Sequence, residues 1–88
     1  MASYEIRFKT AARKDLRRVP AKTLSRIVEA IKELGSNPFP SDAVKLVDAD
    51  RLYRIRVGDY RVIYEVETEP RTVVVHHVRH RSEVYRSL

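Results

Sequence analysis

Cysteine is absent from this 88-residue chain. Its absence excludes disulfides and thiolate metal sites, so packing must stabilise the fold, and a reducing cytosol is the natural compartment. No apolar run approaches the roughly 20 residues that cross a bilayer, and no N-terminal segment resembles a signal peptide. These absences predict a soluble, cytoplasmic protein with no membrane partner.

Internal repeats, low-complexity tracts and linkers are also missing from the sequence, so nothing indicates a second domain. A chain of this length can bury only about 60–65% of the surface of its unfolded state. We therefore expect one modestly stable domain over residues 1–88.

Positive charge is in excess and unevenly placed. The chain has 18 lysines and arginines against 12 acidic residues, a formal net charge of +6. Arginine dominates residues 51–61 and 71–86, whereas the acids are scattered. This pattern is expected of a protein that binds a phosphate backbone. Binding at a membrane surface would need a basic amphipathic helix with exposed aromatics, which the sequence does not show.

The most informative segment is LYRIRVGDYRVIYEV, residues 52–66. Its alternating residues predict two strands joined by Gly58-Asp59, a short connection typical of tight hairpins. With a two-residue loop, Arg56 lies opposite Arg61, and directly opposed residues share a face of the sheet. Arg54 falls on the same face as these two. The other face is apolar and contains Tyr53, Ile55, Val57, Tyr60, Val62 and Tyr64.

Placing Arg56 and Arg61 opposite each other, with Cβ atoms about 5 Å apart, is mildly destabilising because like charges repel. A fold that keeps such a pair is expected to bind an anion there. Phosphate is favoured because a planar guanidinium donates two hydrogen bonds to it at once. The alternative is that these arginines are only solvated surface residues. The tyrosines of the apolar face are expected to pack rather than to stack on bases.

The remaining segments predict an α+β fold. Residues 3–8 alternate as a short strand, Thr10 is placed to cap a helix that stops before Pro20, and a second helix runs from near Pro20 to Leu34. Residues 44–47 are a weak strand or an extended stretch, and residues 72–78 are rich in β-branched side chains, as in a central strand. We predict two N-terminal helices packed on one face of a small twisted, mainly antiparallel four-stranded sheet. The second helix carries one apolar stripe, formed by Leu24, Ile27, Val28, Ile31 and Leu34.

A helical pair ending in NPFP, the hairpin LYRIRVGDYRVIYEV and the terminal RHRSEVYR together resemble the RelE/ParE superfamily of toxins from type II toxin–antitoxin pairs. The resemblance spans nearly the whole chain, and its middle and last segments are the specific ones. It implies the RelE-like fold and, for members with RelE-like activity, cleavage of messenger RNA in the ribosomal A site. The implied enzyme is a metal-independent endoribonuclease without a cofactor. In it the RNA 2′-hydroxyl attacks the adjacent phosphate and leaves a 2′,3′-cyclic phosphate and a 5′-hydroxyl.

The resemblance implies roles for five residues. Arg54 and Arg56 match two family lysines that bind the backbone and are proposed to help deprotonate the 2′-hydroxyl. Arg61 matches an arginine that stabilises charge on the phosphate, and Arg79 one proposed to protonate the leaving oxygen. Tyr85 matches a tyrosine that stacks on a messenger base and orients the nucleophile. Arginine in place of lysine weakens a general-base role, because a guanidinium with a pKa above about 12 is a poor proton acceptor.

Three histidines lie close to Arg79 in the sequence. Alternation puts His77 on the face of Arg79, and His76 and His80 on the other face while the strand stays regular. His77 and His80 are candidate acids or bases because imidazole titrates near neutral pH. For His76 we expect a hydrogen bond within the sheet. No acidic residue is placed to complete a metal site with them, so none is expected. Further basic residues are candidates for contacts with messenger or ribosomal RNA, or are simply solvated: Lys45, Arg51, Arg81, Arg13, Lys14, Arg17 and Arg18.

Three functions remain open from the sequence. The leading hypothesis is a ribosome-dependent mRNA endonuclease that inhibits translation and is neutralised by a cognate antitoxin. The first alternative is a ParE-like inhibitor of DNA gyrase without a nuclease site, and the second is an inactive relative that acts with its antitoxin as a corepressor. The free toxin is expected to be a monomer. With its antitoxin it is expected to form a higher-order complex through an apolar helix groove and ion pairs.

Overall fold

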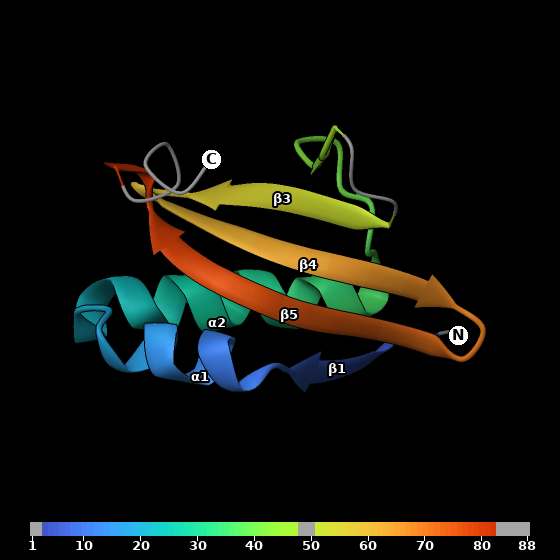
Figure 1. The fold of residues 1–88 in the computed structure, drawn as a ribbon, viewed down its shortest axis with the longest axis horizontal. Helices are drawn as coiled ribbons and strands as arrows, with labels where there is room; N and C mark the ends of the chain where they lie inside the picture. The colour runs from blue at the N-terminus through green and yellow to red at the C-terminus, as the bar shows by residue number, and fades with distance from the viewer. Residues whose placement is uncertain (1–2, 48–50, 83–88) are drawn as a thin grey trace.

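The computed structural model describes residues 3–47 and 51–82, which form two helices and a five-stranded sheet (Figure 1). The strands lie in the order β1-β5-β4-β3-β2. The strand β1 is parallel to β5, and every other neighbouring pair is antiparallel. The elements in chain order are β1 (Glu5–Phe8), α1 (Thr10–Arg17), α2 (Ala21–Ser36), β2 (Val44–Lys45), β3 (Leu52–Val57), β4 (Tyr60–Thr68) and β5 (Arg71–His80).

The predicted α+β fold is confirmed, with one strand more than the four expected. The additional strand is β2, which lies within the weak strand or extended stretch predicted at residues 44–47. Its two residues pair with Arg54 and Tyr53 at the edge of the sheet. The strand β5 lies between β1 and β4, in the interior position that its β-branched sequence predicts. Helix α2 lies across one face of the sheet, and α1 packs beside β5 (Figure 1). Neither helix in the described ranges is long and apolar enough to cross a membrane.

The helix ends differ slightly from the sequence prediction. Thr10 is the first residue of α1, and Lys9 takes the cap position without a side-chain cap. The Lys9 N–H donates to the Val75 carbonyl (2.9 Å), so Lys9 still pairs with β5. The helix therefore begins directly after the strand pairing, with no residue between them to serve as a cap. Helix α2 also continues through Gly35 to Ser36. The Gly35 carbonyl accepts from the Tyr4 N–H (2.7 Å), and a Cβ on Gly35 would lie only 3.3 Å from the Tyr4 oxygen. Glycine here permits close approach of β1 rather than stopping the helix.

The core lies between α2 and the sheet. From the predicted stripe, Ile27, Ile31 and Leu34 are buried, whereas Val28 is 36% exposed. Tyr64 of β4 is fully buried, and its hydroxyl donates to the Pro38 carbonyl (2.8 Å) in the loop after α2. This bond ties the loop to the sheet and confirms that Tyr64 is a packing residue.

The β3–β4 hairpin has the predicted register. Arg56 pairs with Arg61, Arg54 with Ile63, and Val57 with Tyr60, so Gly58-Asp59 is the two-residue loop. Gly58 has φ +60°, in the left-handed region that glycine adopts without a steric cost. The hairpin turn therefore depends on this glycine.

Gly58→Ala is expected to destabilise the protein by about 1 kcal/mol, because an alanine at this φ is strained. Gly58→Asn is the matched control, since asparagine tolerates the left-handed region far better. Urea unfolding of the three proteins measures the difference. Equal stabilities for the alanine and asparagine variants would show that the φ of this residue does not matter.

The pairing of β4 with β5 contains one irregularity. Ile63 pairs with His77 but Tyr64 pairs with Val75, so His76 is an extra residue in β5. Such a bulge shifts the alternation of side chains by one position. The prediction that His76 lies on the face opposite His77 is therefore wrong, because it assumed a regular strand. Both histidines lie on the face away from the core, which matches the burial of Val75 and Val78 on either side.

Candidate functional site

Three arginines from three strands form a row across the sheet. Arg56 of β3 pairs with Arg61 of β4, and Arg61 pairs in turn with Arg79 of β5. Opposed residues in adjacent strands share a face and have Cβ atoms about 5 Å apart. The sequence predicts the first of these pairs, and the structure adds Arg79 on the far side of Arg61.

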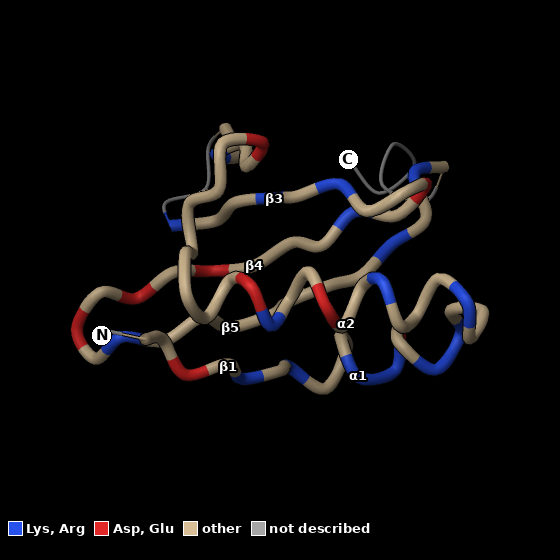
Figure 2. The backbone as a smooth tube through the Cα atoms, turned by 180° about the vertical axis from the view of Figure 1, so that it is seen from behind, with Lys and Arg blue, Asp and Glu red and all other residues tan. Residues whose placement is uncertain are grey.

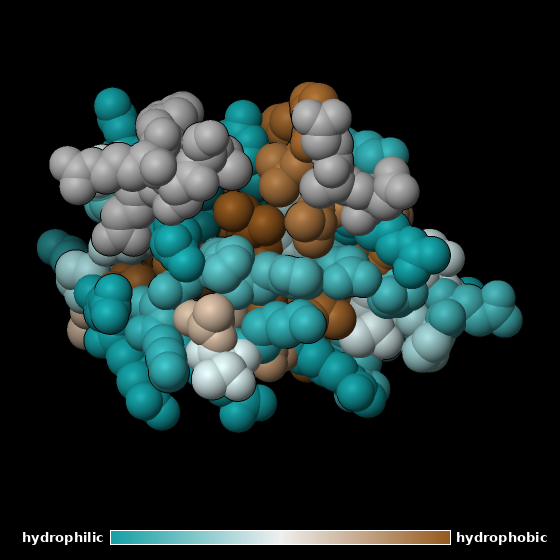
Figure 3. Space-filling model, viewed as in Figure 1, coloured by the Kyte–Doolittle hydropathy of each residue, from teal (hydrophilic) through white to brown (hydrophobic). Residues whose placement is uncertain are grey.

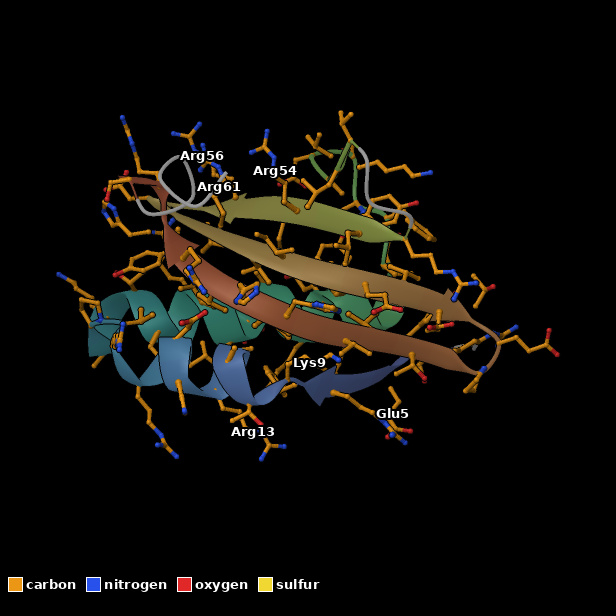
Figure 4. All side chains as sticks on the ribbon, in the orientation of Figure 1. Glu5, Lys9, Arg13, Arg54, Arg56 and Arg61 are labelled. Carbon is orange, nitrogen blue, oxygen red and sulfur yellow. The ribbon has the colours of Figure 1, made fainter. Side chains whose placement is uncertain are left out.

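A second row lies two residues further along the same face. It contains Arg54, Ile63 and His77 in register. Figure 4 shows Arg54, Arg56 and Arg61 gathered at one end of the hairpin, on the side away from the helices. We call the surface formed by Arg54, Arg56, Arg61 and Arg79 the arginine face.

The four side chains of the arginine face differ in their exposure to solvent. Arg56 is exposed, Arg54 and Arg79 are half-buried, and Arg61 at the centre is only 6% exposed. Burial from water strengthens the electrostatic attraction that a cation exerts on an anion. Arg61 is therefore the member of the row whose charge is least screened by solvent.

The contacts of the arginines differ. Arg56 Nε donates a long hydrogen bond to the Gly58 carbonyl (3.4 Å). Arg79 Nε donates to Asp15 Oδ2 (3.3 Å), and its Nη2 donates to His77 Nδ1 (3.1 Å). No described residue forms a hydrogen bond or ion pair with the Arg54 side chain. The Asp15 carboxylate offsets part of the charge of Arg79.

The His77 ring lies between Arg79 and Asp15, with its Nδ1 3.1 Å from Arg79 Nη2 and 3.7 Å from Asp15 Oδ2. Burial is the main cause that lowers its pKa below 6.5, and the Arg79 charge lowers the pKa further. A guanidinium can only donate, so Nδ1 of His77 accepts and Nε2 carries the proton. The basic nitrogen of His77 is thereby occupied. This arrangement favours a role in holding Arg79 over the proton transfer considered from the sequence.

His76 and Glu65 form a separate pair on the same side of the sheet. His76 Nε2 lies 2.9 Å from Glu65 Oε1, and both side chains are about a quarter exposed, at 24% and 25%. The expected hydrogen bond of His76 within the sheet is thus present. The bond from His76 lowers the pKa of the Glu65 carboxyl below its ordinary value.

Glu65 is expected to make stability depend on pH. Its folded-state pKa lies below the ordinary value of 4.5, so the carboxylate stabilises the fold above that value. This contribution is lost as the pH falls through the folded-state pKa. Urea unfolding between about pH 6 and about pH 3 should show a smaller loss of stability for Glu65→Gln than for the wild type.

The control for this measurement is Glu29→Gln, the same change on the exposed surface of α2. It should keep the pH dependence of the wild type. Parallel stability curves for the wild type and Glu65→Gln would contradict the assignment of this pH dependence to Glu65.

Two other predicted site residues lie elsewhere. His80 pairs with Tyr60 in register and forms an edge-to-face ring contact with it (centroids 5.3 Å apart). This places His80 on the opposite face from Arg79, as alternation predicts, so it does not join the arginine face. Tyr85 lies outside the described residues.

The additional basic residues are dispersed. Arg51 forms an ion pair with Glu67 (3.1 Å), and Arg81 approaches Asp59 at 4.0 Å. Lys45 is exposed on β2 at the edge of the sheet. Four basic residues of and after α1 are all exposed, and Figure 2 shows this positive charge along α1: Arg13, Lys14, Arg17 and Arg18. In Figure 4, Arg13 lies on the opposite side of the molecule from the arginine face.

Sequence reasoning missed Asp15, the carboxylate that contacts Arg79. Asp15 is the one acidic residue of α1, TAARKDLR. It lies three residues after the buried Ala12 and four before the buried Val19, so it falls on the apolar stripe of the helix. An acid on the buried stripe of an otherwise basic helix is the signal that could have identified it.

Comparison with known proteins agrees with this architecture. Residues 6–85 match the family model described as ParE toxin of type II toxin–antitoxin system, parDE. The chain is 34% identical over 84 residues to Toxin RelG of Mycobacterium tuberculosis, covering 94% of this chain and 97% of that protein.

Two solved structures share the fold. The M. tuberculosis RelBE2 toxin–antitoxin complex contains a chain 33% identical to this one, with a TM-score of 0.80 over 93% of this chain and 95% of the other. The archaeal RelE–RelB complex of Pyrococcus horikoshii contains one 30% identical, with a TM-score of 0.80 over 92% and 97%. With a family match over nearly its whole length, the chain belongs to the ParE toxin family of type II toxin–antitoxin systems and is a RelE-like member of the RelE/ParE superfamily.

Proposed function

We propose that this toxin is an endoribonuclease that cleaves messenger RNA in the ribosomal A site and thereby inhibits translation. The observation that carries the proposal is the row of Arg56, Arg61 and Arg79 across three strands. A fold gains no stability from three adjacent like charges, but it gains a preorganised site for a phosphate. The resemblance to members with RelE-like activity is what implies RNA as the source of that phosphate.

The proposed reaction needs only the RNA, the protein and water. The 2′-oxygen forms a bond to the adjacent phosphorus while the bond from phosphorus to the 5′-oxygen breaks. The products are a 2′,3′-cyclic phosphate and a 5′-hydroxyl. The 2′-hydroxyl gives its proton to solvent water and the 5′-oxygen takes one up from solvent water, so protons balance, while negative charge builds up on the phosphate oxygens.

The arginine face is suited to stabilise that charge. Arg61 is proposed to bind the phosphate oxygens from the centre of the row, with Arg54 and Arg56 holding the backbone on one side. Arg79, which lies beside Arg61 in the row, is proposed to face the leaving oxygen. Guanidinium groups exchange protons poorly near neutral pH, so their main contribution is electrostatic. Tyr85 is proposed to stack on a base of the messenger.

The proposal includes partners and place of action. Messenger RNA and the ribosome are the targets, so the protein acts in the cytoplasm, and exposed basic residues of α1 are candidates for contacts with ribosomal RNA. A cognate antitoxin is proposed because the RelE-like relatives of known structure include toxin–antitoxin complexes.

Two regions are suited to bury apolar side chains of such an antitoxin. A hollow of about 160 Å³ lies between α2 and β3, lined in part by Leu34, Ile55 and Val57. Apolar residues are also exposed near β2, where Figure 3 shows brown surface, namely Phe39, Val44 and Val47.

Primer extension on a messenger RNA in a purified translation system tests the proposal. Adding the protein should produce new 5′ ends within codons, only when ribosomes are translating, and protein synthesis should fall. Intact messenger RNA with unimpaired translation would contradict it.

The matching family model is named for ParE, which keeps a gyrase inhibitor as the second candidate. That function predicts gyrase-dependent DNA damage and no effect of Arg61→Ala, because no phosphate is cleaved. An inactive corepressor predicts that expression of the chain without antitoxin does not arrest growth. The same purified proteins, assayed with gyrase and with ribosomes, separate these functions from the proposed one.

A further inference from the structure

Asp15 of α1 makes two hydrogen bonds with the end of β5, and its Oδ2 also lies 3.7 Å from His77 Nδ1. Its Oδ2 accepts a hydrogen bond from the Val78 N–H (3.0 Å) and another from Arg79 Nε (3.3 Å). The Asp15 side chain is only 13% exposed. A carboxylate this enclosed is stabilised by its donors, and here one donor belongs to the backbone and the other to the arginine face.

The fold explains the backbone contact. The strand β1 pairs with β5 only as far as Phe8 opposite Val75. Beyond this point α1 takes the place of a neighbouring strand beside β5 (Figure 1). The Val78 N–H then needs an acceptor that is not a strand carbonyl, and Asp15 supplies it. The same carboxylate oxygen reaches Arg79, the next residue of the strand.

The contact with Arg79 determines which of its hydrogen-bond donors are occupied. A guanidinium has five N–H donors. Asp15 takes the Nε–H, and His77 Nδ1 takes one hydrogen of Nη2. In the described parts of the chain no other residue accepts from Arg79, so three donors remain for a ligand. The two acceptors lie 3.7 Å apart (Asp15 Oδ2 to His77 Nδ1) and contact two different nitrogens of the guanidinium, so together they fix the plane of the group before any ligand arrives.

The charge of Asp15 also matters to the row. Arg79 lies beside Arg61 in register, and a carboxylate behind Arg79 offsets part of the repulsion between the two guanidinium groups. The same attraction keeps Arg79 from turning away into solvent.

We infer that Asp15 is a positioning residue, which holds the Arg79 guanidinium in the plane that presents its remaining donors to the scissile phosphate. This inference rests on the proposed function and adds a residue of α1 to a site otherwise built on the sheet. It assigns Asp15 no contact with RNA. Asp15 affects cleavage only by holding Arg79 in place.

Asp15→Asn tests the inference, because asparagine keeps an oxygen acceptor for the Val78 N–H and removes the charge that holds Arg79. In the purified translation system we expect the rate of messenger RNA cleavage at saturating toxin to fall about tenfold to a hundredfold, the range for a misplaced catalytic group. The half-saturating toxin concentration should change little. In an Arg79→Ala background the same substitution should have no further effect. An equal loss in both backgrounds would overturn the inference, because Asp15 would then act through stability or another group.

A second measurement does not depend on cleavage. In NMR spectra the Arg79 Nε–H should exchange slowly with water in the wild type and at least tenfold faster in Asp15→Asn. The pKa of His77, which faces Arg79, Asp15 and His76, should fall further in this variant, because the Asp15 carboxylate raises it. Glu5→Gln, the same change in an exposed pair with Arg7, should alter neither signal.

These readouts separate the two proposals. If the wild type cleaves no RNA, the proposed function fails, and the NMR measurements still decide whether Asp15 holds Arg79. Unchanged exchange of the Arg79 Nε–H in Asp15→Asn would overturn the inference even if the wild type is an active nuclease.

Discussion

Arg61→Ala is expected to lower the rate of messenger RNA cleavage about 100- to 1,000-fold, the cost of removing one preorganised donor to a developing anion. Arg61 lies at the centre of the row, between Arg56 and Arg79, and it is 6% exposed. Its charge is therefore the least screened of the three, and no neighbouring arginine can occupy the same position. Primer extension over a time course in the purified translation system gives the rates.

The matched control is Arg71→Ala, which removes an exposed arginine from the opposite end of β5. This variant should cleave at the wild-type rate, because Arg71 lies eight residues before Arg79, far from the row. Thermal unfolding of both variants shows whether the fold is intact. A folded Arg61→Ala protein that cleaves as fast as Arg71→Ala would contradict the proposed role of Arg61.

Tyr64→Ala is expected to have the largest effect on stability, about 3–5 kcal/mol, as for other large aromatic residues removed from a core. Tyr64 is fully buried, stacks on Tyr53 with ring centroids 5.9 Å apart, and binds the Pro38 carbonyl. Its removal leaves a cavity and releases the loop after α2. Since small domains are stable by only about 5–15 kcal/mol, this variant should lose a large part of its stability. Urea unfolding followed by circular dichroism would show this loss as a lower midpoint.

Tyr64→Phe separates the ring from the hydroxyl. Only the hydrogen bond to Pro38 is lost in this variant, so we expect a destabilisation of about 1 kcal/mol. Equal losses in the two variants would mean that the bond, rather than the packing of the ring, stabilises this part of the core. Neither variant changes a side chain of the arginine face.

The sequence predicts the hairpin well because two local rules agree there. Gly58-Asp59 sets a two-residue loop, and strict alternation assigns each side chain to a face. The pairing of Arg56 with Arg61 follows from these alone, as the register confirms. The strand β2 is harder to predict, because two residues paired at an edge carry almost no periodic signal.

The parts that the sequence does not predict depend on contacts between distant segments. The bulge at His76 is set by how β5 pairs with β4. Its one signal in the sequence is a break in alternation, since two adjacent polar residues, His76 and His77, separate Val75 from Val78. The contact between Asp15 and Arg79 joins positions 64 residues apart. Local spacing predicts neighbouring arginines only when they belong to one hairpin, as Arg56 and Arg61 do. The family resemblance implies a role for Arg79, but its position beside Arg61 is known only from the fold.

The central claim is that Arg61 and Arg79 act on the same phosphate. A double-mutant cycle tests it most directly: cleavage rates are measured for the wild type, Arg61→Ala, Arg79→Ala and the double variant in one translation system. Residues that act as a unit are strongly non-additive, so the double variant should be little slower than the slower single variant. A loss equal to the product of the two single losses would mean that the two arginines act independently, and the row would not be a single phosphate site.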